Sequence, residues 1–163
     1  MDTPHESRLT TELRRLLSLR RTAALATVDA EDGPFASLVP YAVDPAAPGL
    51  VLLISGLAAH TRHIGSRPKV SLLIVDHEPE EGPVHALSRL TILADARVVE
   101  PGEAGREALQ QRYLQRFPDA EPLTLLPDFR YVVLQPRAVR QVAGFGTARD
   151  VPLNQFERLL RSM

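Results

Sequence analysis

The sequence has 163 residues, a formal net charge of −1, no cysteine and no tryptophan. This length predicts one domain. The near-zero charge gives no overall attraction to nucleic acid or an anionic membrane. The lack of cysteine excludes disulfides and thiolate metal sites. The polar N-terminus lacks a signal-peptide core and no apolar run approaches the ~20 residues that span a bilayer, so we expect a cytoplasmic protein.

The hydrophobic pattern consists of short apolar runs separated by turns that contain Gly or Pro, with helical spacing near both ends of the chain. The predicted elements, in order, are a helix over 7–19, strands over 22–28, 35–43 and 50–54, a short helix between 55 and 67, strands over 69–76 and 87–99, a helix over 101–117, strands over 129–134 and 138–143, and a helix over 154–162. Long helices do not alternate with the strands, which favours a mainly antiparallel β-barrel with peripheral helices. The expected single domain covers 1–163, with an N-terminal helix in 1–19, the barrel in 20–151 and a C-terminal helix in 152–163.

The segment 50–76 is the most informative part of the chain, because two strongly apolar runs flank a short polar segment. That polar segment contains Ser55, Gly56, His60, Thr61, Arg62 and His63. Free backbone N–H groups at a helix start, together with hydroxyl and basic side chains, are typical of a phosphate site. A solvated helix that merely connects two strands explains the same residues equally well.

Three other positions are candidates for ligand contact. Arg89 lies within an apolar strand, where its charge must either face a ligand or pair on the solvent side with Asp95 or Glu100. Ser37 and Tyr41 lie on one face of the strand that contains Pro40, and Pro40 places that strand at a sheet edge or a bulge. His60 and His63 have the spacing of a metal-binding pair, but no third ligand is apparent and we expect no metal.

Three stretches of the chain resemble the FMN-binding split-barrel superfamily of pyridoxamine phosphate oxidase. They are ATVDAEDGPFASLVPYAVD, LLISGLAAHTRHIGSRPKVSLLIVD and SRLTILADARVV. Together with VAGFGTARDV, they are most similar to the HugZ-type haem-utilisation branch, and the resemblance covers about residues 19–151.

The resemblance implies a six-stranded antiparallel split barrel that forms a homodimer, with FMN in clefts between the subunits. It implies that the cofactor contacts Ser37, Val39, Pro40, Tyr41, Ser55, His60, Thr61, Arg62 and Arg89. His60 stands where the oxidases have a lysine. Arg89 stands where they have a glutamine that contacts the flavin ring, and where the haem-utilisation branch commonly has arginine.

The expected function is therefore that of an FMN-dependent oxidoreductase with an unknown small-molecule redox substrate and no assigned catalytic residue. The oxidases' C-terminal substrate motif has no match here, since the chain lacks tryptophan, so pyridoxamine phosphate is not the expected substrate. Two alternatives remain open. One is a haem-binding protein of the HugZ type, although longer members of that branch carry a further C-terminal domain. The other is a non-catalytic dimeric flavin-binding or regulatory module.

Overall fold

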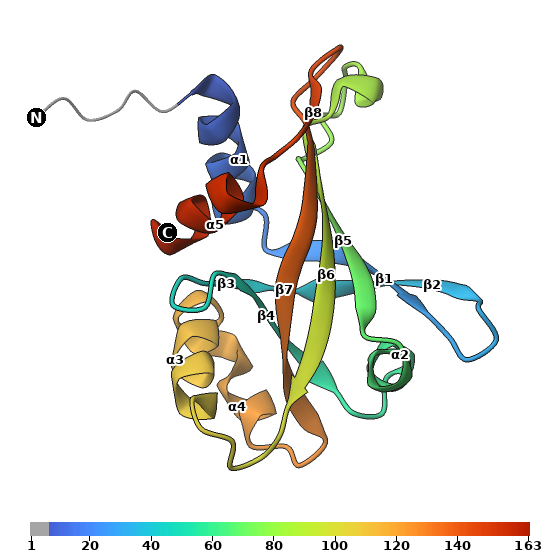
Figure 1. The fold of residues 1–163 in the computed structure, drawn as a ribbon, viewed down its shortest axis with the longest axis vertical. Helices are drawn as coiled ribbons and strands as arrows, with labels where there is room; N and C mark the ends of the chain where they lie inside the picture. The colour runs from blue at the N-terminus through green and yellow to red at the C-terminus, as the bar shows by residue number, and fades with distance from the viewer. Residues whose placement is uncertain (1–6) are drawn as a thin grey trace, which may run out of the picture.

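The computed structural model describes residues 7–163 and shows one curved antiparallel sheet with helices around it (Figure 1). The strands are β1 (Thr22–Val28), β2 (Pro34–Pro40), β3 (Ala42–Asp44), β4 (Gly49–Ser55), β5 (Lys69–Val75), β6 (Arg89–Val99), β7 (Phe129–Val142) and β8 (Ala148–Asp150). The order across the sheet is β2-β1-β5-β6-β7-β4-β3, and β8 pairs with β7. The predicted mainly β split-barrel fold is confirmed, with eight strands rather than six.

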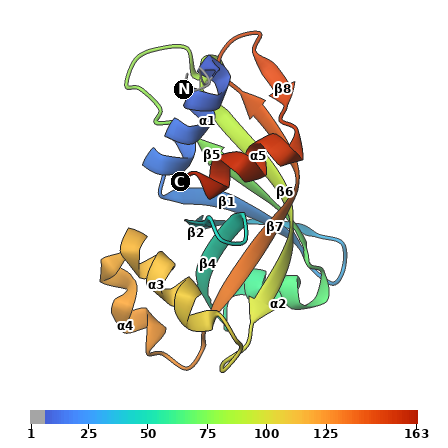
Figure 2. The ribbon, with the colours of Figure 1, turned by 60° about the vertical axis from the view of Figure 1, so that its left-hand side comes forward.

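Five α-helices and two 3₁₀ turns surround the sheet. They are α1 (Arg8–Leu19), α2 (Ala59–Ser66), η1 (Val84–Ala86), α3 (Arg106–Arg116), η2 (Pro118–Ala120), α4 (Glu121–Thr124) and α5 (Leu153–Arg161). α1 and α5 lie side by side against one part of the sheet, whereas α3 and α4 lie together lower in the view (Figures 1 and 2). α2 lies between the end of β4 and the start of β5 (Figure 1), as its position in the sequence between two strands predicted.

The main core lies between α1, α5 and the inner side of the sheet. Leu16 and Leu17 of α1, Leu25 of β1, Ile92 of β6 and Phe156 of α5 are each fully buried and belong to one cluster. Ser7 begins α1 because its side chain accepts a hydrogen bond from the backbone N–H of Thr10. A smaller cluster, which includes Tyr113 of α3 and Tyr131 of β7, packs α3 against β3, β4 and β7.

The predicted strand over 35–43 is divided in the structure. β2 ends at Pro40 and β3 begins at Ala42, because Pro40 has no N–H for the ladder and the N–H of Tyr41 bonds instead to the carbonyl of Arg21 at 3.2 Å. The prediction that Pro40 lies at an edge is confirmed, since β2 is the last strand at one end of the sheet order.

Three further element predictions were wrong in detail. The predicted strands over 129–134 and 138–143 form the single strand β7, in which Pro136 pairs with Ala94 beside a register shift in β6. The helix predicted from Pro101 begins only at Arg106, after turns at Gly102 and Gly105, which both have positive φ. The connector 118–128 contains η2 and α4.

Candidate functional site

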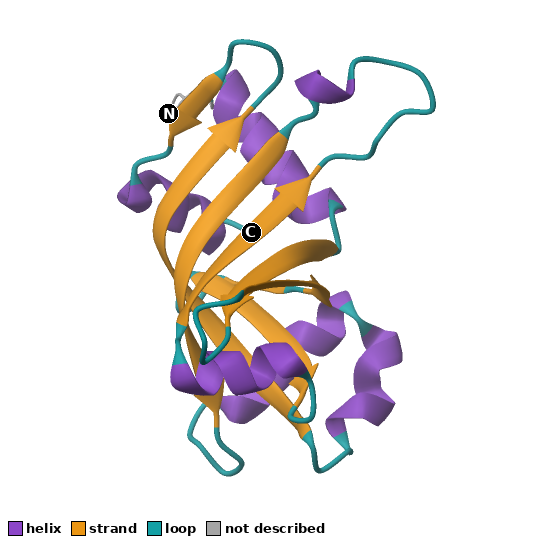
Figure 3. Ribbon diagram, turned by 90° about the vertical axis from the view of Figure 1, so that its right-hand side faces the viewer, coloured by secondary structure: helices purple, strands orange, loops and turns teal. Residues whose placement is uncertain are grey.

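The outer side of the sheet carries apolar side chains that the chain itself leaves uncovered. Along β1, β2, β5 and β6 alternate residues point away from the core, and large ones stay exposed: Leu38 at 72%, Leu93 at 48% and Leu73 at 36%. Strand register places them beside small residues, so the outer face contains Ala24, Ala26, Ala36, Leu38, Leu73, Leu93 and Ala138, with Ser71 and Thr91 among them. Figure 3 shows the upper strands from a side on which no helix covers them. Contiguous exposed apolar surface of this kind marks an interaction or ligand site.

Two grooves meet on the outer face. One has a volume of about 560 Å³ and lies between residues of β1, β5, β6 and β7, and the other, of about 380 Å³, extends toward β8. The two grooves share Leu93, Arg137 and Ala138 as lining residues. Together they offer an apolar floor bordered by Arg137 and Arg140, which form ion pairs with Asp95 and Asp150.

Arg89 lies on this outer side, at the first position of β6. The alternation of β6 buries Leu90 and Ile92 and leaves Arg89 half-buried on the side that also carries Leu93. Its Nη1 donates to the carbonyl oxygen of Leu87 at 3.1 Å, and none of the described carboxylates forms an ion pair with it. A half-buried guanidinium without an acidic partner is suited to an anionic group on a ligand.

The alternative partner for Arg89 on the solvent side is engaged elsewhere. Asp95 of β6 forms an ion pair with Arg137 of β7 at 3.2 Å. The solvent-side pairing of Arg89 with Asp95 that the sequence left open is therefore not formed.

The predicted phosphate site lies where β4 leads into α2. The Oγ atom of Ser55 donates to Oδ2 of Asp128 at 2.7 Å and accepts from the backbone N–H of Leu57 at 3.1 Å. The N–H of Gly56 donates to the carbonyl of Asp128 at 2.6 Å, and a Cβ at position 56 would lie 2.8 Å from that oxygen. Glycine is required here by this close approach, and the Asp128 carboxylate adds a negative charge beside the helix start.

Two other predicted phosphate contacts already have partners within the chain. The hydroxyl of Thr61 donates to the carbonyl of Ser55 at 2.6 Å, and Nη1 of Arg62 donates to the carbonyl of Leu57 at 2.7 Å. These bonds stabilise the turn and the first residues of α2. They leave less hydrogen-bonding capacity for an anion than the sequence pattern suggested.

His60 differs from its neighbours because its Nε2 is buried and has no hydrogen-bond partner among the described residues. Burial lowers the pKa of His60 below its ordinary value of 6.5, and the nearby His63 lowers it further. The imidazole is therefore neutral at pH 7. His63 is held differently: its Nδ1 lies 2.9 Å from the hydroxyl of Thr27, and its ring meets the Phe35 ring edge-on.

The predicted contacts on β2 face both sides of the strand. Val39 is buried and Ser37 half-buried on the inner side, where the Ser37 Oγ has no hydrogen-bond partner among the described residues, whereas Pro40 is exposed. Tyr41 is fully buried, and its hydroxyl donates to the carbonyl of Leu17 at 3.2 Å. The Tyr41 side chain therefore packs in the core instead of facing the surface.

Within one subunit the structure separates Arg89 from the α2 segment. The residues after α2 reach β6 at Ala96, whose N–H donates to the carbonyl of Pro68 at 2.7 Å. Arg89 lies seven residues earlier on the same strand, which corresponds to about 23 Å at ~3.3 Å per residue. A ligand that contacts both regions must therefore be large or lie between two subunits.

Comparison with known proteins identifies the family to which this fold and these residues belong. A family model described as pyridoxamine 5′-phosphate oxidase matches residues 9–143. The chain belongs to this family. Its curated relatives include the heme oxygenase HutZ of Vibrio cholerae, 34% identical over 90% of this chain and 82% of HutZ. The non-canonical heme oxygenase HOZ of Arabidopsis thaliana is 33% identical over 84% of this chain and 41% of HOZ.

Solved structures of the family show the same fold. A heme-binding protein from Mycobacterium smegmatis superposes with a TM-score of 0.80 at 27% identity, over 94% of this chain and 61% of its own. The HutZ structure, described as a heme storage protein, gives a TM-score of 0.75 at 32% identity over 82% of this chain and 94% of its own. These relatives confirm the resemblance to the haem-utilisation branch.

Two features are absent from the part of the chain that the structure describes. No helix within 7–163 combines the length and apolar character needed to cross a membrane. The same residues contain no group of three or more His, Asp or Glu side chains placed to hold a metal ion.

Sequence reasoning did not single out the outer face or Asp128. The period-two pattern of 22–28 and 87–99 contains the signal for the outer face, because apolar residues occupy both sides of these strands. Asp128 has no comparable signal, since it reaches Ser55 across 73 positions of sequence.

Proposed function

We propose that this protein is a haem-binding, haem-degrading member of the pyridoxamine 5′-phosphate oxidase family and acts as a homodimer. The observation that carries the proposal is Arg89, a half-buried cation without an acidic partner, at the border of the uncovered apolar outer face. Haem is a flat apolar disc with two carboxylates. Its ring matches the apolar outer face, and its carboxylates match the cationic Arg89. The haem oxygenase HutZ and the haem-binding protein of M. smegmatis support the proposal by similarity.

Each part of the outer face has a role in this proposal. Leu38, Leu73 and Leu93 supply apolar contact area to the porphyrin and to the second subunit, which excludes water from both. Arg89 binds a propionate or another anionic ligand group through its planar guanidinium. If bound, haem would supply the iron for oxygen chemistry, and a histidine side chain of the protein would hold that iron.

The first test of this proposal is a hemin titration followed by absorbance. We expect a Soret band that saturates near one haem per subunit and that is lost in one member of a set of single His→Ala variants. Replacing Arg89→Ala should weaken haem binding about tenfold, as expected for loss of one charged hydrogen bond of ~1.4 kcal/mol or more. Arg97→Ala is the matched control, because Arg97 lies on the same strand but is exposed and pairs with Glu103 at 2.6 Å.

The degradation step has its own readout. Haem-loaded protein supplied with ascorbate and oxygen should lose its Soret band, and a tetrapyrrole ring-opening product should appear by mass spectrometry. Absence of any Soret band with wild-type protein, or equal affinity in Arg89→Ala and Arg97→Ala, would contradict the proposal.

FMN is the second candidate, and a separate observation favours it. The Oγ of Ser37 and the Nε2 of His60, two of the predicted FMN contacts, are buried polar atoms without partners among the described residues. A flavin ring on the inner side of β2, beside Ser37 and Val39, would satisfy donors and acceptors of this kind. The phosphate fits less well, since Ser55, Thr61 and Arg62 are engaged within the chain and a neutral His60 replaces a cation.

Quenching of FMN fluorescence distinguishes the two candidates. If FMN is the physiological cofactor, it binds in the micromolar range or tighter, and His60→Ala combined with Arg89→Ala weakens it. If haem is the ligand, the same protein leaves FMN fluorescence unchanged at that concentration while it still gives a Soret band. In the first case the protein is an FMN-dependent oxidoreductase with an external electron donor.

A further inference from the structure

The connection between β5 and β6 ends directly at Arg89. Every residue over 77–85 is exposed, so this loop buries little surface of its own. A backbone hydrogen bond, from the N–H of Asp76 to the carbonyl of Ser88 at 2.8 Å, joins its two ends. Arg89 follows as the first residue of β6, and its guanidinium donates to the carbonyl of Leu87. The position of the Arg89 cation therefore depends on how firmly Asp76, Leu87 and Ser88, the loop base, are held together.

The carboxylate of Asp76 ties the loop base to α1. Ile74 of β5 is buried on the core side, so Asp76, two residues later, points to the same side. Nη2 of Arg15 in α1 donates to Oδ2 of Asp76, and Nη1 donates to Oδ1 at 3.4 Å. Oδ1 also accepts from the backbone N–H of His77 at 2.8 Å. These hydrogen bonds, above all those from Arg15, lower the pKa of Asp76 below its ordinary value, so it is charged at pH 7.

Arg15 is itself held by a second carboxylate of α1. Its Nε and Nη2 donate to the two carboxylate oxygens of Glu12, at 2.8 and 2.7 Å. The side chains of Glu12 and Asp76 are only 23% and 21% exposed, so water screens these contacts less than it screens ion pairs on open surface. Arg15 thus forms a fixed bridge between the helix and the loop base.

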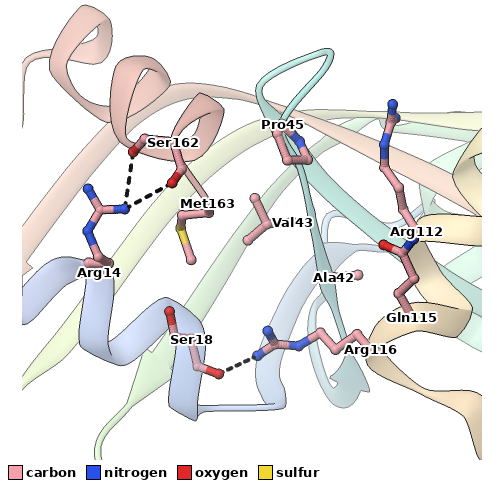
Figure 4. Close-up of a pocket in the computed structure, with 10 residues that line it drawn as sticks. All are labelled: Arg14, Ser18, Ala42, Val43, Pro45, Arg112, Gln115, Arg116, Ser162 and Met163. Atoms are coloured by element: carbon pink, nitrogen blue, oxygen red, sulfur yellow. Dashed lines mark hydrogen bonds between the residues drawn. The ribbon is translucent and has the colours of Figure 1, made fainter.

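α1 is a firm support for this bridge. Leu16 and Leu17 are fully buried in the main core. The C-terminal end of the helix is held from α3, because Nη2 of Arg116 donates to the carbonyl oxygens of Leu17, Ser18 and Arg20 at 3.0, 3.2 and 2.6 Å. Figure 4 shows the bond to Ser18, at the wall of a cavity between α1 and α3. The loop base is therefore connected to a helix that both the core and α3 hold in place.

From these contacts we infer that Asp76 is a positioning residue, which keeps the loop base closed and thereby places the Arg89 guanidinium for its ligand. The inference rests on the proposed role of Arg89 in binding an anionic ligand group. The two side chains lie on opposite faces of the sheet, since Arg89 pairs with Val75 on the outer side and Asp76 faces α1. Asp76 therefore restricts the backbone that carries Arg89 without neutralising its charge. A cation that is fixed in advance loses less conformational entropy when it binds an anion.

Two substitutions that each neutralise one arginine-bound carboxylate test this inference in hemin titrations. Asp76→Asn removes the charge that Arg15 binds. Glu103→Gln is the matched control at the far end of β6, because Glu103 pairs with Arg97 at 2.6 Å and accepts from the backbone N–H of Glu100 at 3.2 Å. We expect Asp76→Asn to bind hemin about fivefold more weakly than the wild type, and Glu103→Gln to bind it within twofold of the wild type.

A double-mutant cycle with Arg89→Ala shows whether Asp76 acts through Arg89. If it does, Asp76→Asn costs nothing further once the guanidinium is gone, and the double variant binds hemin within twofold of Arg89→Ala. A general loss of stability would instead weaken binding by the same factor in both backgrounds. Where Arg89→Ala does weaken binding, full additivity of the two substitutions, or equal affinity of Asp76→Asn and the wild type, would overturn the inference.

NMR relaxation of the Arg89 Nε–H group in the ligand-free protein separates this inference from the haem proposal. Asp76→Asn should lower the order parameter of that group, whereas Glu103→Gln should leave it unchanged. If hemin does not bind, or binds Arg89→Ala as it binds the wild type, the haem proposal is wrong and the relaxation measurement alone decides the role of Asp76. An order parameter that is the same in Asp76→Asn and the wild type would rule out the positioning role, whatever the hemin titrations give.

Discussion

At the scale of single residues, His60 shows how the fold changes the chemistry of a side chain. The sequence places it in a polar segment as a phosphate contact, but the structure buries its Nε2 and lowers its pKa. A neutral imidazole interacts weakly with phosphate, because it lacks the charge that a lysine at this position would supply. The residue therefore supports a ring contact in the proposed FMN site more than a phosphate contact.

The buried His60 also makes a testable contribution to the pH dependence of stability. Its pKa is lower in the folded protein than in the unfolded chain, where it is near 6.5, so the unfolded state binds more protons below that pH. The free energy of unfolding should fall as the pH decreases from 7.5 to 5.5, and His60→Gln should reduce that fall. Urea denaturation at pH 7.5 and pH 5.5 measures the free energy of unfolding of each variant. His77→Gln, at an exposed position, is the control. An equal pH dependence in His60→Gln and the wild type would contradict this assignment.

At the scale of elements, α1 and α5 are held to the sheet by large apolar side chains in one common core. Leu13, Leu16 and Leu17 of α1 and Phe156, Leu159 and Leu160 of α5 all belong to it. Gln155 of α5 bonds to Thr10 of α1 at 3.0 Å, which links the two helices directly. These contacts hold α1 and α5 against each other and against the sheet, and the single domain over 1–163 stays a prediction.

The contribution of α5 can be measured with two phenylalanines of different burial. Phe156 is fully buried, so Phe156→Ala should lower the free energy of unfolding by about 3–5 kcal/mol through lost burial and the remaining cavity. Phe145 is 76% exposed, so Phe145→Ala should change the free energy of unfolding by less than about 0.5 kcal/mol. Chemical denaturation of both variants gives the comparison. Similar effects of the two substitutions would show that α5 does not pack as described.

At the scale of the whole molecule, the uncovered outer face and the separation of Arg89 from α2 both favour a dimer. A second copy of the chain would cover Leu38, Leu73 and Leu93, and it would bring another Arg89 toward the region between the subunits. We propose the homodimer on the exposed fraction of these leucines.

Substituting one leucine on the outer face should therefore alter the oligomeric state. Leu93→Glu places a charge in the middle of the proposed interface, and we expect it to convert a dimer to a monomer and to weaken haem binding at least tenfold. Light scattering after size-exclusion chromatography measures the mass. Leu125→Glu is the control, because Leu125 is 81% exposed and follows α4, outside the outer face. A wild-type monomer, or a dimer that withstands Leu93→Glu, would contradict the proposed interface.

Much of the fold followed from local patterns in the sequence. Period-two apolar alternation predicted the strands and the leucine spacing predicted α1. The turn between β1 and β2 is also local, with Asp29 accepting from the N–H of Gly33 at 2.6 Å. These features depend on neighbours only a few positions apart, so one sequence suffices to find them. The joining of two predicted strands into β7 and the late start of α3 depend on pairing and packing with distant segments, which local patterns do not contain.

The sequence by itself determined the split-barrel fold, the family and Arg89 as an unusual cation in an apolar strand. Only the tertiary structure decided which polar groups are free. It paired Ser55 with Asp128, placed the Tyr41 hydroxyl against Leu17 in the core, and left Arg89 without an acidic partner. The physical reason is that hydrogen bonding and desolvation depend on groups brought together across the whole chain, whereas propensity and periodicity act between near neighbours.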